Sequence, residues 1–392
     1  MAAGAGIDRV LQSAIDAGDV PGVVALAASD RGVFYRGAFG RREIGSGPSM
    51  TIDTIFRIAS MTKAVTSVAA LQLVEQEKLV FDEPIGRVLP ELAAPLVLDG
   101  FAASGKPRLR PAKRPITLHH LLTHTAGFGY EMLNAELIRY IAATKTPSTS
   151  TGKLASLRLP LLFDPGERWQ YGINIDWLGR AIEAASGQPL DDYFREHIFD
   201  PLDMADSGFV LGPEQNTRLM RAHRRKTDGS LEAIEVESPP RKPEFWGGGG
   251  ALYSTGPDYM RFLQMLLGGG EFDGVRVLRP ETVREIGRNQ IGDLPAGTMR
   301  TAMPERTQDF VLFPEGSCRW GLANMINTEP GPNGRSAGSL SWGGIFNTYY
   351  WIDPAKRIAA VILTQILPFA DARALALYGA FERAVYAALE AD

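Results

Sequence analysis

Hydrophobic and polar positions near the N-terminus predict one helix followed by two strands. Residues 7–15 carry apolar side chains at helical spacing, and Gly18 follows them as a stop signal. Residues 23–29 and 33–39 are rich in β-forming residues and flank the turn sequence Asp-Arg-Gly, which is typical of a β-hairpin. The chain is therefore expected to begin helix, strand, strand.

The C-terminal pattern mirrors this beginning. Residues 348–352 and 357–364 are β-rich runs separated by Asp-Pro-Ala-Lys, and residues 374–385 form a helical apolar stripe. Residues 81–243 show mostly helical pattern and loop, with proline-rich breaks and few strand-like runs. We expect an α/β (α+β) fold, in which an antiparallel sheet is flanked by the N- and C-terminal helices. Residues 1–80 and 244–392 would form this sheet domain, residues 81–243 a mainly helical lobe, with the active site between them.

Composition narrows the class of protein. The chain has 392 residues, of which 45% are hydrophobic and 22% charged, and its net charge is -4. Neither a long basic run nor an uninterrupted apolar run of membrane-spanning length occurs, so we expect no nucleic-acid partner and no membrane span. The N-terminus lacks the pattern of a secretory signal, which predicts a cytoplasmic protein. The oligomeric state is not predicted.

Metal and thiol chemistry find little support in the sequence. Cys318 is the single cysteine, and the five histidines all lie far upstream of it. No histidine pair or carboxylate cluster has the spacing of metal ligands, so neither a metal nor another cofactor is expected. Most lone cysteines are inert small hydrophobic residues.

The strongest chemical signal is the run Ser60-Met61-Thr62-Lys63. Residues 64–74 contain only three polar side chains, so the helix they form is expected in the interior. Burial would lower the pKa of Lys63 and make it a plausible base. Ser60 lies three residues earlier, on the same helix face, where its hydroxyl can meet the amine. By itself such a run is also explained by a serine N-cap followed by an exposed lysine.

Two glycine-containing segments have more than one interpretation. Residues 247–250 are four consecutive glycines, which indicate either a flexible turn or close backbone approach beside a site. Residues 334–338 fit the GxSxG pattern around Ser336 that marks α/β-hydrolases. That fold needs a histidine after the serine, and none follows His223, so Ser336 is not expected to be a nucleophile.

Several further motifs give the chain a resemblance to a known family. In chain order they are TLHHLLTHTAGF at 117–128, FDPGERWQY at 163–171, PLDMADSGF at 201–209, GGGALY at 248–253 and SWGG at 341–344. Together with the Ser-x-x-Lys run, they resemble the serine β-lactamase and penicillin-binding-protein superfamily. The resemblance is to class C β-lactamases and, more closely, to the family VIII carboxylesterases that share their fold.

The resemblance implies roles for individual residues. Tyr171 matches the family tyrosine that hydrogen-bonds the nucleophile and the lysine, so Ser60, Lys63 and Tyr171 would be the catalytic residues. Class C enzymes follow this tyrosine with a small residue and asparagine, whereas Gly172 and Ile173 stand here. A polar substrate contact is therefore missing, and Asn174 lies one place too late to be its equivalent.

Trp342, Gly343 and Gly344 occupy the place of the Lys-Thr-Gly motif of β-lactamases. A tryptophan offers an apolar wall and one N–H donor instead of a lysine for the substrate carboxylate, as in family VIII esterases. The resemblance also assigns the backbone N–H groups of Ser60 and Ile345 to an oxyanion hole. Each such donor contributes roughly 3 to 4 kcal/mol to the transition state.

Other residues near the motifs have weaker expectations. His124 is interpreted as structural rather than catalytic. The loops at 96–115 and 130–159 are expected to roof the pocket. Four aromatic residues close to the motifs are candidates for substrate binding: Phe128, Tyr130, Trp246 and Phe346.

The resemblance implies a serine carboxylesterase that hydrolyses short-chain, small-molecule esters through an acyl-enzyme on Ser60. Three alternatives stay open. The first is a β-lactamase or D,D-peptidase, which Trp342 disfavours. The second is an acyltransferase with the same Ser-Lys-Tyr machinery. The third is a catalytically silent binding protein on this fold.

Overall fold

The computed structural model describes residues 2–322 and 324–390. Its centre is a seven-stranded sheet in the order β11-β12-β13-β14-β15-β1-β2, and the neighbouring strands are antiparallel. The predicted α/β fold class with a large antiparallel sheet is thus confirmed. The strands are β1 (Gly22–Ser29), β2 (Gly32–Gly40), β11 (Cys318–Trp320), β12 (Met325–Asn327), β13 (Leu340–Gly344), β14 (Thr348–Asp353) and β15 (Ile358–Leu363).

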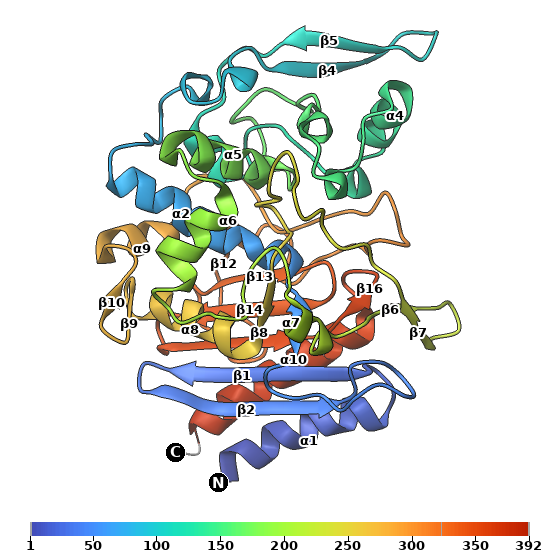
Figure 1. Ribbon diagram of the computed structural model, residues 1–392, viewed down its shortest axis with the longest axis vertical. Helices are drawn as coiled ribbons and strands as arrows, with labels where there is room; N and C mark the ends of the chain where they lie inside the picture. The colour runs from blue at the N-terminus through green and yellow to red at the C-terminus, as the bar shows by residue number, and fades with distance from the viewer. Residues whose placement is uncertain (1, 323, 391–392) are drawn as a thin grey trace.

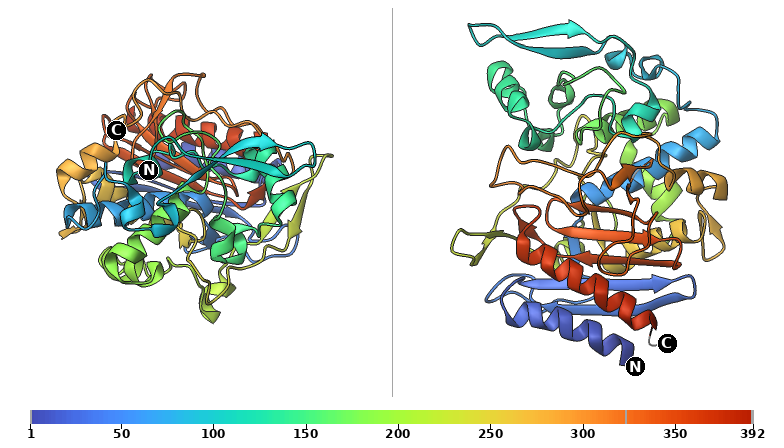
Figure 2. Two further views of the ribbon diagram at one scale, coloured as in Figure 1. Left: turned by 90° about the horizontal axis from the view of Figure 1, so that it is seen from above. Right: turned by 180° about the vertical axis from the view of Figure 1, so that it is seen from behind.

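Helices cover both faces of this sheet. Because successive strand residues point to opposite faces, the neighbours of β14 identify the two layers. Tyr349 stacks on Tyr378 of α10 (Ala372–Glu390), whereas the next residue, Tyr350, meets Tyr259 of α8 (Gly256–Leu267). Helix α1 (Ala2–Asp16) packs beside α10 and β2, so both termini lie at one end of the molecule (Figures 1 and 2).

A group of helices lies at the opposite edge of the sheet, around α2 (Thr62–Glu75) (Figure 1). Every residue from Thr62 to Leu73 is buried, which confirms the expectation from the apolar sequence that this helix is internal. Helices α5 (Asn174–Ser186) and α6 (Leu190–Phe194) pack against it. The remaining helices are α3 (Leu118–Leu122), α4 (Ala135–Thr144), α7 (Pro213–Thr217) and α9 (Pro280–Ile286).

The middle segment contains more strand than its sequence pattern suggested. Strands β4 (Leu96–Phe101) and β5 (Pro107–Pro111) form a hairpin, and β6 (Ala222–Arg225) pairs with β7 (Leu231–Ile234). Strand β6 also pairs with β16 (Ile366–Leu367), which lies far away in the sequence. Strands β6 and β16 are two to four residues long and have no regular alternation of apolar and polar residues, so periodicity could not find them. The exact division into a sheet domain and a helical lobe stays a prediction.

Two further strand pairs are short. Strand β3 (Ile55–Arg57), which precedes Ser60, pairs with β8 (Tyr253–Thr255), which follows the glycine run. Strands β9 (Glu271–Phe272) and β10 (Val275–Arg276) form a small hairpin. Within the described residues, no helix combines the length and the apolar character needed to cross a bilayer.

Candidate active site

Ser60 lies on a single turn of 3-10 helix, Ala59–Met61, that leads directly into α2. The preceding residue, Ala59, has a φ of 45°. This left-handed conformation costs a residue with a side chain about 1 to 3 kcal/mol, and such strain clusters at functional sites. The turn holds the Ser60 hydroxyl at the start of the buried helix, on the wall of a cavity.

The Lys63 ammonium is buried directly behind Ser60. Its Nζ donates to three uncharged oxygens: Ser60 Oγ at 3.2 Å, Tyr130 OH at 3.1 Å and Gly249 O at 2.6 Å. An ammonium has three N–H donors, so each donor has one partner. The side chain is only 1% exposed, and these contacts fix its direction. The predicted meeting of Ser60 and Lys63 is therefore present.

Two tyrosines lie beside Lys63, and the one that hydrogen-bonds it is not the one that the sequence predicted. The Tyr171 ring faces the ammonium, with Nζ 4.6 Å from its centroid, but its hydroxyl accepts a hydrogen bond from Trp342 Nε1 at 3.1 Å. The phenol that hydrogen-bonds Lys63 is that of Tyr130, which the sequence suggested only as a pocket wall. Burial raises the pKa of Tyr130 well above its usual value, so this phenol stays protonated.

Strand β13 brings its Trp-Gly-Gly motif against the Ser60 turn. A side chain at Gly344 would collide with the carbonyl oxygen of Ile58, so only glycine lets the strand pass this close. The indole N–H of Trp342 is engaged by Tyr171, and Trp342 therefore orients that phenol. Beyond the strand, the N–H of Ile345 donates no hydrogen bond to the described backbone.

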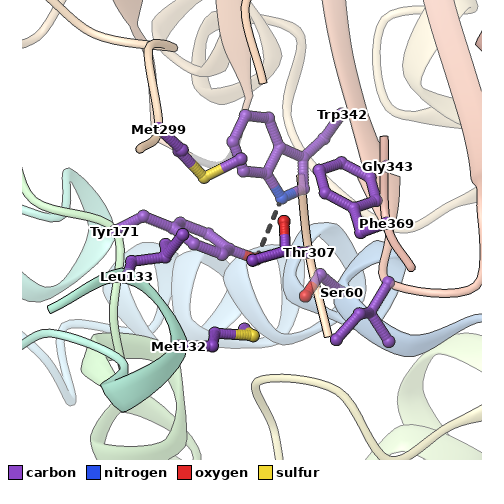
Figure 3. A pocket seen from close by; sticks show the side chains of 10 residues that line it. Ser60, Met132, Leu133, Tyr171, Met299, Thr307, Trp342, Gly343 and Phe369 are labelled. Atoms are coloured by element: carbon purple, nitrogen blue, oxygen red, sulfur yellow. Dashed lines mark hydrogen bonds between the residues drawn. The ribbon is translucent and has the colours of Figure 1, made fainter. Parts of the chain in front are cut away.

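The cavity beside Ser60 is narrow and mostly apolar (Figure 3). Its volume of about 20 Å³ is the room that roughly one water molecule needs. Tyr171, Trp342, Gly343 and Ile345 border it as expected from the sequence. Five further lining residues carried no sequence motif: Met132, Leu133, Met299, Thr307 and Phe369.

A second cavity lies on the other side of Ile345. It has a volume of about 230 Å³ and includes Ala59, Trp246 and Phe346 in its wall. The structure thus brings two of the four candidate aromatic residues beside the nucleophile turn. Arg57, Arg306 and Glu237 also border this cavity, so its wall carries charged side chains that the first cavity lacks.

Other predicted residues lie away from Ser60. Phe128 does not border either of these cavities; it stacks on Trp177, and both border a separate cavity of about 380 Å³. Phe128 thus lies away from the Ser60 cavity, and its role in substrate binding stays a prediction. The loop at 96–115 forms the β4–β5 hairpin and borders this separate cavity. Of the two predicted roof segments, only 130–159 contributes to the Ser60 cavity, through Met132 and Leu133.

His124 packs beneath Tyr171, with ring centroids 4.9 Å apart. Its Nδ1 pairs with Asn174 Nδ2 at 2.9 Å, so Asn174 faces away from the substrate side. Burial, and secondarily the charge of Lys63, lower the pKa of His124 well below its usual value. The imidazole is therefore neutral and supports the tyrosine by packing.

The glycine run approaches the site closely, as one of its two interpretations required. Gly249 O accepts from Lys63, and Gly248 O accepts from Thr66 Oγ1 at 2.7 Å. Ser336, in contrast, lies on the loop before β13, where its N–H donates to Asp353. Cys318 is buried in β11, and burial raises its pKa to about 11.

Sequence reasoning missed Asp176, a buried carboxylate on α5 behind the glycine run. Its Oδ1 accepts the N–H of Gly249 at 3.0 Å. The only sequence signal was an acidic residue in the first turn of a predicted helix, which is common. Among residues 2–322 and 324–390, no group of three or more His, Cys, Asp or Glu side chains is arranged to hold a metal ion.

The antiparallel sheet with helices on both faces, and a Ser-x-x-Lys run that opens a buried helix, define a serine β-lactamase-like protein. A family model described as Beta-lactamase matches residues 7–384. The chain belongs to this beta-lactamase family.

Named relatives indicate which branch of the family is similar. The chain is 33% identical to the monacolin J acid methylbutanoyltransferase of Aspergillus terreus, covering 97% of this chain and 95% of that protein. It is 32% identical to the lovastatin esterase of Penicillium rubens, covering 92% and 93% respectively. The solved structure of unliganded simvastatin synthase from Aspergillus terreus matches with a TM-score of 0.84 and 30% identity over 100% of both chains.

Proposed function

We propose that the protein is a serine carboxylesterase that forms an acyl-enzyme on Ser60 from small-molecule esters with short acyl chains. The observation that carries the proposal is the buried Lys63 amine, 3.2 Å from Ser60 Oγ at the wall of an apolar cavity. A serine beside an amine held in this way is the arrangement of an activated nucleophile. The Trp-Gly-Gly motif on the facing strand, which the sequence resemblance links to family VIII carboxylesterases, supports an ester over a β-lactam.

The acylation half-reaction needs groups from four residues: Ser60, Lys63, Tyr171 and Ile345. In the reactive form Lys63 has released one of its three protons to solvent; Ser60 Oγ attacks the ester carbonyl carbon, and its proton passes to this amine. The N–H groups of Ser60 and Ile345 donate to the carbonyl oxygen as it becomes an oxyanion. Tyr171 gives its hydroxyl proton to the leaving alkoxide, and the new Lys63 ammonium beside its ring stabilises the phenolate. Alcohol then leaves.

Deacylation reverses these proton movements. A water molecule gives a proton to the Tyr171 phenolate and attacks the acyl carbonyl carbon. When the tetrahedral intermediate collapses, Lys63 returns its proton to Ser60 Oγ and the acid leaves. The same geometry accepts an alcohol in place of water, and similarity to a methylbutanoyltransferase favours acyl transfer as the second candidate function.

The size and polarity of the cavity support a short acyl group. The lining side chains Met132, Met299 and Phe369 are apolar, and the available volume is small. Methionine side chains are flexible, so they can move aside for an acyl chain of a few carbons. Substrates with longer chains require larger displacements of closely packed residues.

The test is covalent labelling with a fluorophosphonate, followed by turnover of p-nitrophenyl esters. We expect one label per chain on Ser60, and loss of both labelling and turnover in Ser60→Ala. Ser336→Ala is the matched control and should keep both, because Ser336 lies on a distant loop. Labelling on another residue, or no labelling and no turnover by folded protein, would contradict the proposal and favour a silent binding protein.

A further inference from the structure

The glycine run that holds Lys63 is itself held by the carboxylate of Asp176. Gly249 has two contacts of opposite kind: its carbonyl oxygen accepts from Lys63 Nζ at 2.6 Å, and its N–H donates to Asp176 Oδ1 at 3.0 Å. One residue without a side chain thus connects the catalytic lysine of the proposed function to a carboxylate on α5. Asp176 itself is 4% exposed.

Gly249 and Asp176 fit closely together. A Cβ atom at position 249 would come within 2.5 Å of Asp176 Oδ2, and the nearest atoms it meets all belong to Asp176. The requirement for glycine at this position therefore comes from the carboxylate. The carbonyl oxygen of the neighbouring Gly248 accepts a hydrogen bond from Thr66 of α2. With the contact of Gly249 to Asp176 of α5, hydrogen bonds to both helices hold the glycine run in place.

The direction of the Lys63 ammonium depends on Gly249. Lys63 has three hydrogen-bond partners, and the Gly249 carbonyl is the nearest of them. If this carbonyl moves, the ammonium reorients and loses its alignment with Ser60 Oγ. Misplacement of a catalytic group by about 1 Å can lower the rate by roughly 100-fold.

We propose that Asp176 is a positioning residue, which aligns Lys63 with Ser60 by accepting the N–H of Gly249. The role rests on the proposed function, because it acts only through the lysine. The hydrogen bond requires an acceptor at this place, and a carboxylate or a side-chain amide oxygen supplies one.

The experiment compares substitutions that keep or remove this acceptor. Asp176→Ala should lower kcat for p-nitrophenyl acetate by about 100-fold with KM changed less than about threefold, because positioning affects the chemical step rather than binding. Asp176→Asn keeps an oxygen that can accept from Gly249 and should recover most of kcat. An Asp176→Asn variant as slow as Asp176→Ala, or an Asp176→Ala variant with wild-type kcat, would overturn the proposal.

Gly249 variants separate alignment from space filling. In the double variant Asp176→Ala with Gly249→Ala, the added methyl group occupies the vacated room but provides no acceptor. We expect kcat to stay as low as in Asp176→Ala, and recovery would show that Asp176 only fills space. If Asp176→Ala does not fold, Gly249→Ala alone tests the proposal, because its methyl group displaces the Asp176 carboxylate from the Gly249 N–H. Wild-type kcat in Gly249→Ala would contradict the proposal.

Asp258→Ala is the matched control. Asp258 is also a buried carboxylate in the first turn of a helix, and it accepts the backbone N–H of Asp206 at 2.8 Å. Its loss should lower the melting temperature without lowering kcat. Fluorophosphonate labelling of the wild type is measured in parallel. If the wild type neither labels nor turns over esters, the proposed function fails; if it does both and Asp176→Ala matches it, only the positioning role fails.

Discussion

Tyr130 and Tyr171 both lie beside Lys63, but their hydroxyl groups occupy different positions and therefore have different roles. Tyr130 hydrogen-bonds the ammonium at 3.1 Å but does not border the Ser60 cavity. Tyr171 borders that cavity together with Ser60, where its hydroxyl can reach a leaving group. We therefore assign the proton transfer to Tyr171 and the support of Lys63 to Tyr130.

Replacing each tyrosine by phenylalanine tests this assignment of roles. Tyr171→Phe removes a proton donor, and general acid–base groups contribute roughly 10² to 10⁴-fold, so kcat should fall by that factor. Tyr130→Phe removes one hydrogen bond to a charged group, with an expected loss of about tenfold. Steady-state turnover of p-nitrophenyl acetate measures both. A larger loss in Tyr130→Phe than in Tyr171→Phe would reverse the assignment.

Cys318 gives a prediction about thiol reactivity. Burial raises its pKa to about 11, so at pH 8 only about one thiol in a thousand is the reactive thiolate. Native protein should resist alkylation by iodoacetamide at pH 8, and it should react readily after unfolding in guanidinium chloride. Intact-mass measurement of the two samples checks this. Rapid alkylation of the native thiol with loss of turnover would instead indicate an accessible cysteine near the active site.

At the scale of elements, a buried ion pair attaches α10 to the loop before β13. Arg335 is 1% exposed; its Nε donates to Glu382 at 2.8 Å and its guanidinium also donates to Tyr378 at 2.7 Å. Both partners lie on α10. Removing one member of a buried pair leaves the other charge without compensation.

We expect Glu382→Ala to lower the free energy of unfolding by about 3 to 5 kcal/mol, as measured by urea denaturation. Arg335→Met combined with Glu382→Leu removes both charges and should recover most of the loss. Exposed ion pairs serve as control: Arg300 pairs with Asp309 and with Glu315, and the three side chains are 61%, 47% and 62% exposed, so Arg300→Ala should cost less than about 1 kcal/mol. Equal losses in the buried and exposed variants would contradict the expected effect of burial.

At the scale of the whole molecule, the sequence predicted the elements that a local pattern of residues encodes, but not the pairing of distant segments. The β1–β2 hairpin follows from two β-rich runs around a turn sequence, and the internal helix α2 follows from the apolar run after Lys63. The β6–β16 pairing joins segments more than 130 residues apart, and neither strand has a periodic pattern. Such long-range pairing depends on the assembled fold rather than on local sequence.

In the candidate site, too, the sequence identified residues that lie in motifs but not those that only folding brings together. Ser60, Lys63, Tyr171 and Trp342 could be proposed because each lies in a motif. Met132, Met299 and Phe369 border the same cavity, yet each has an ordinary apolar sequence context. The contact of Asp176 with the glycine run was also hidden, because it joins residues 73 positions apart. Only the folded chain shows which distant side chains meet.

The cavity beside Ser60, which these distant segments form, leads to a prediction about the preferred length of the acyl chain. The space between its walls is only about 20 Å³, so an acyl chain that enters between Met132, Met299 and Phe369 displaces packed side chains, and longer chains displace more. Turnover of p-nitrophenyl esters should therefore be fastest for acetyl to butanoyl and fall at least about tenfold by octanoyl, since one methylene in a fitted pocket changes selectivity by roughly 10 to 200-fold. Met299→Ala opens the wall and should move the optimum to longer chains, while Leu96→Ala, on the distant hairpin, should leave it unchanged. An octanoyl optimum in the wild type would show that the substrate uses the larger cavity beyond Ile345 instead.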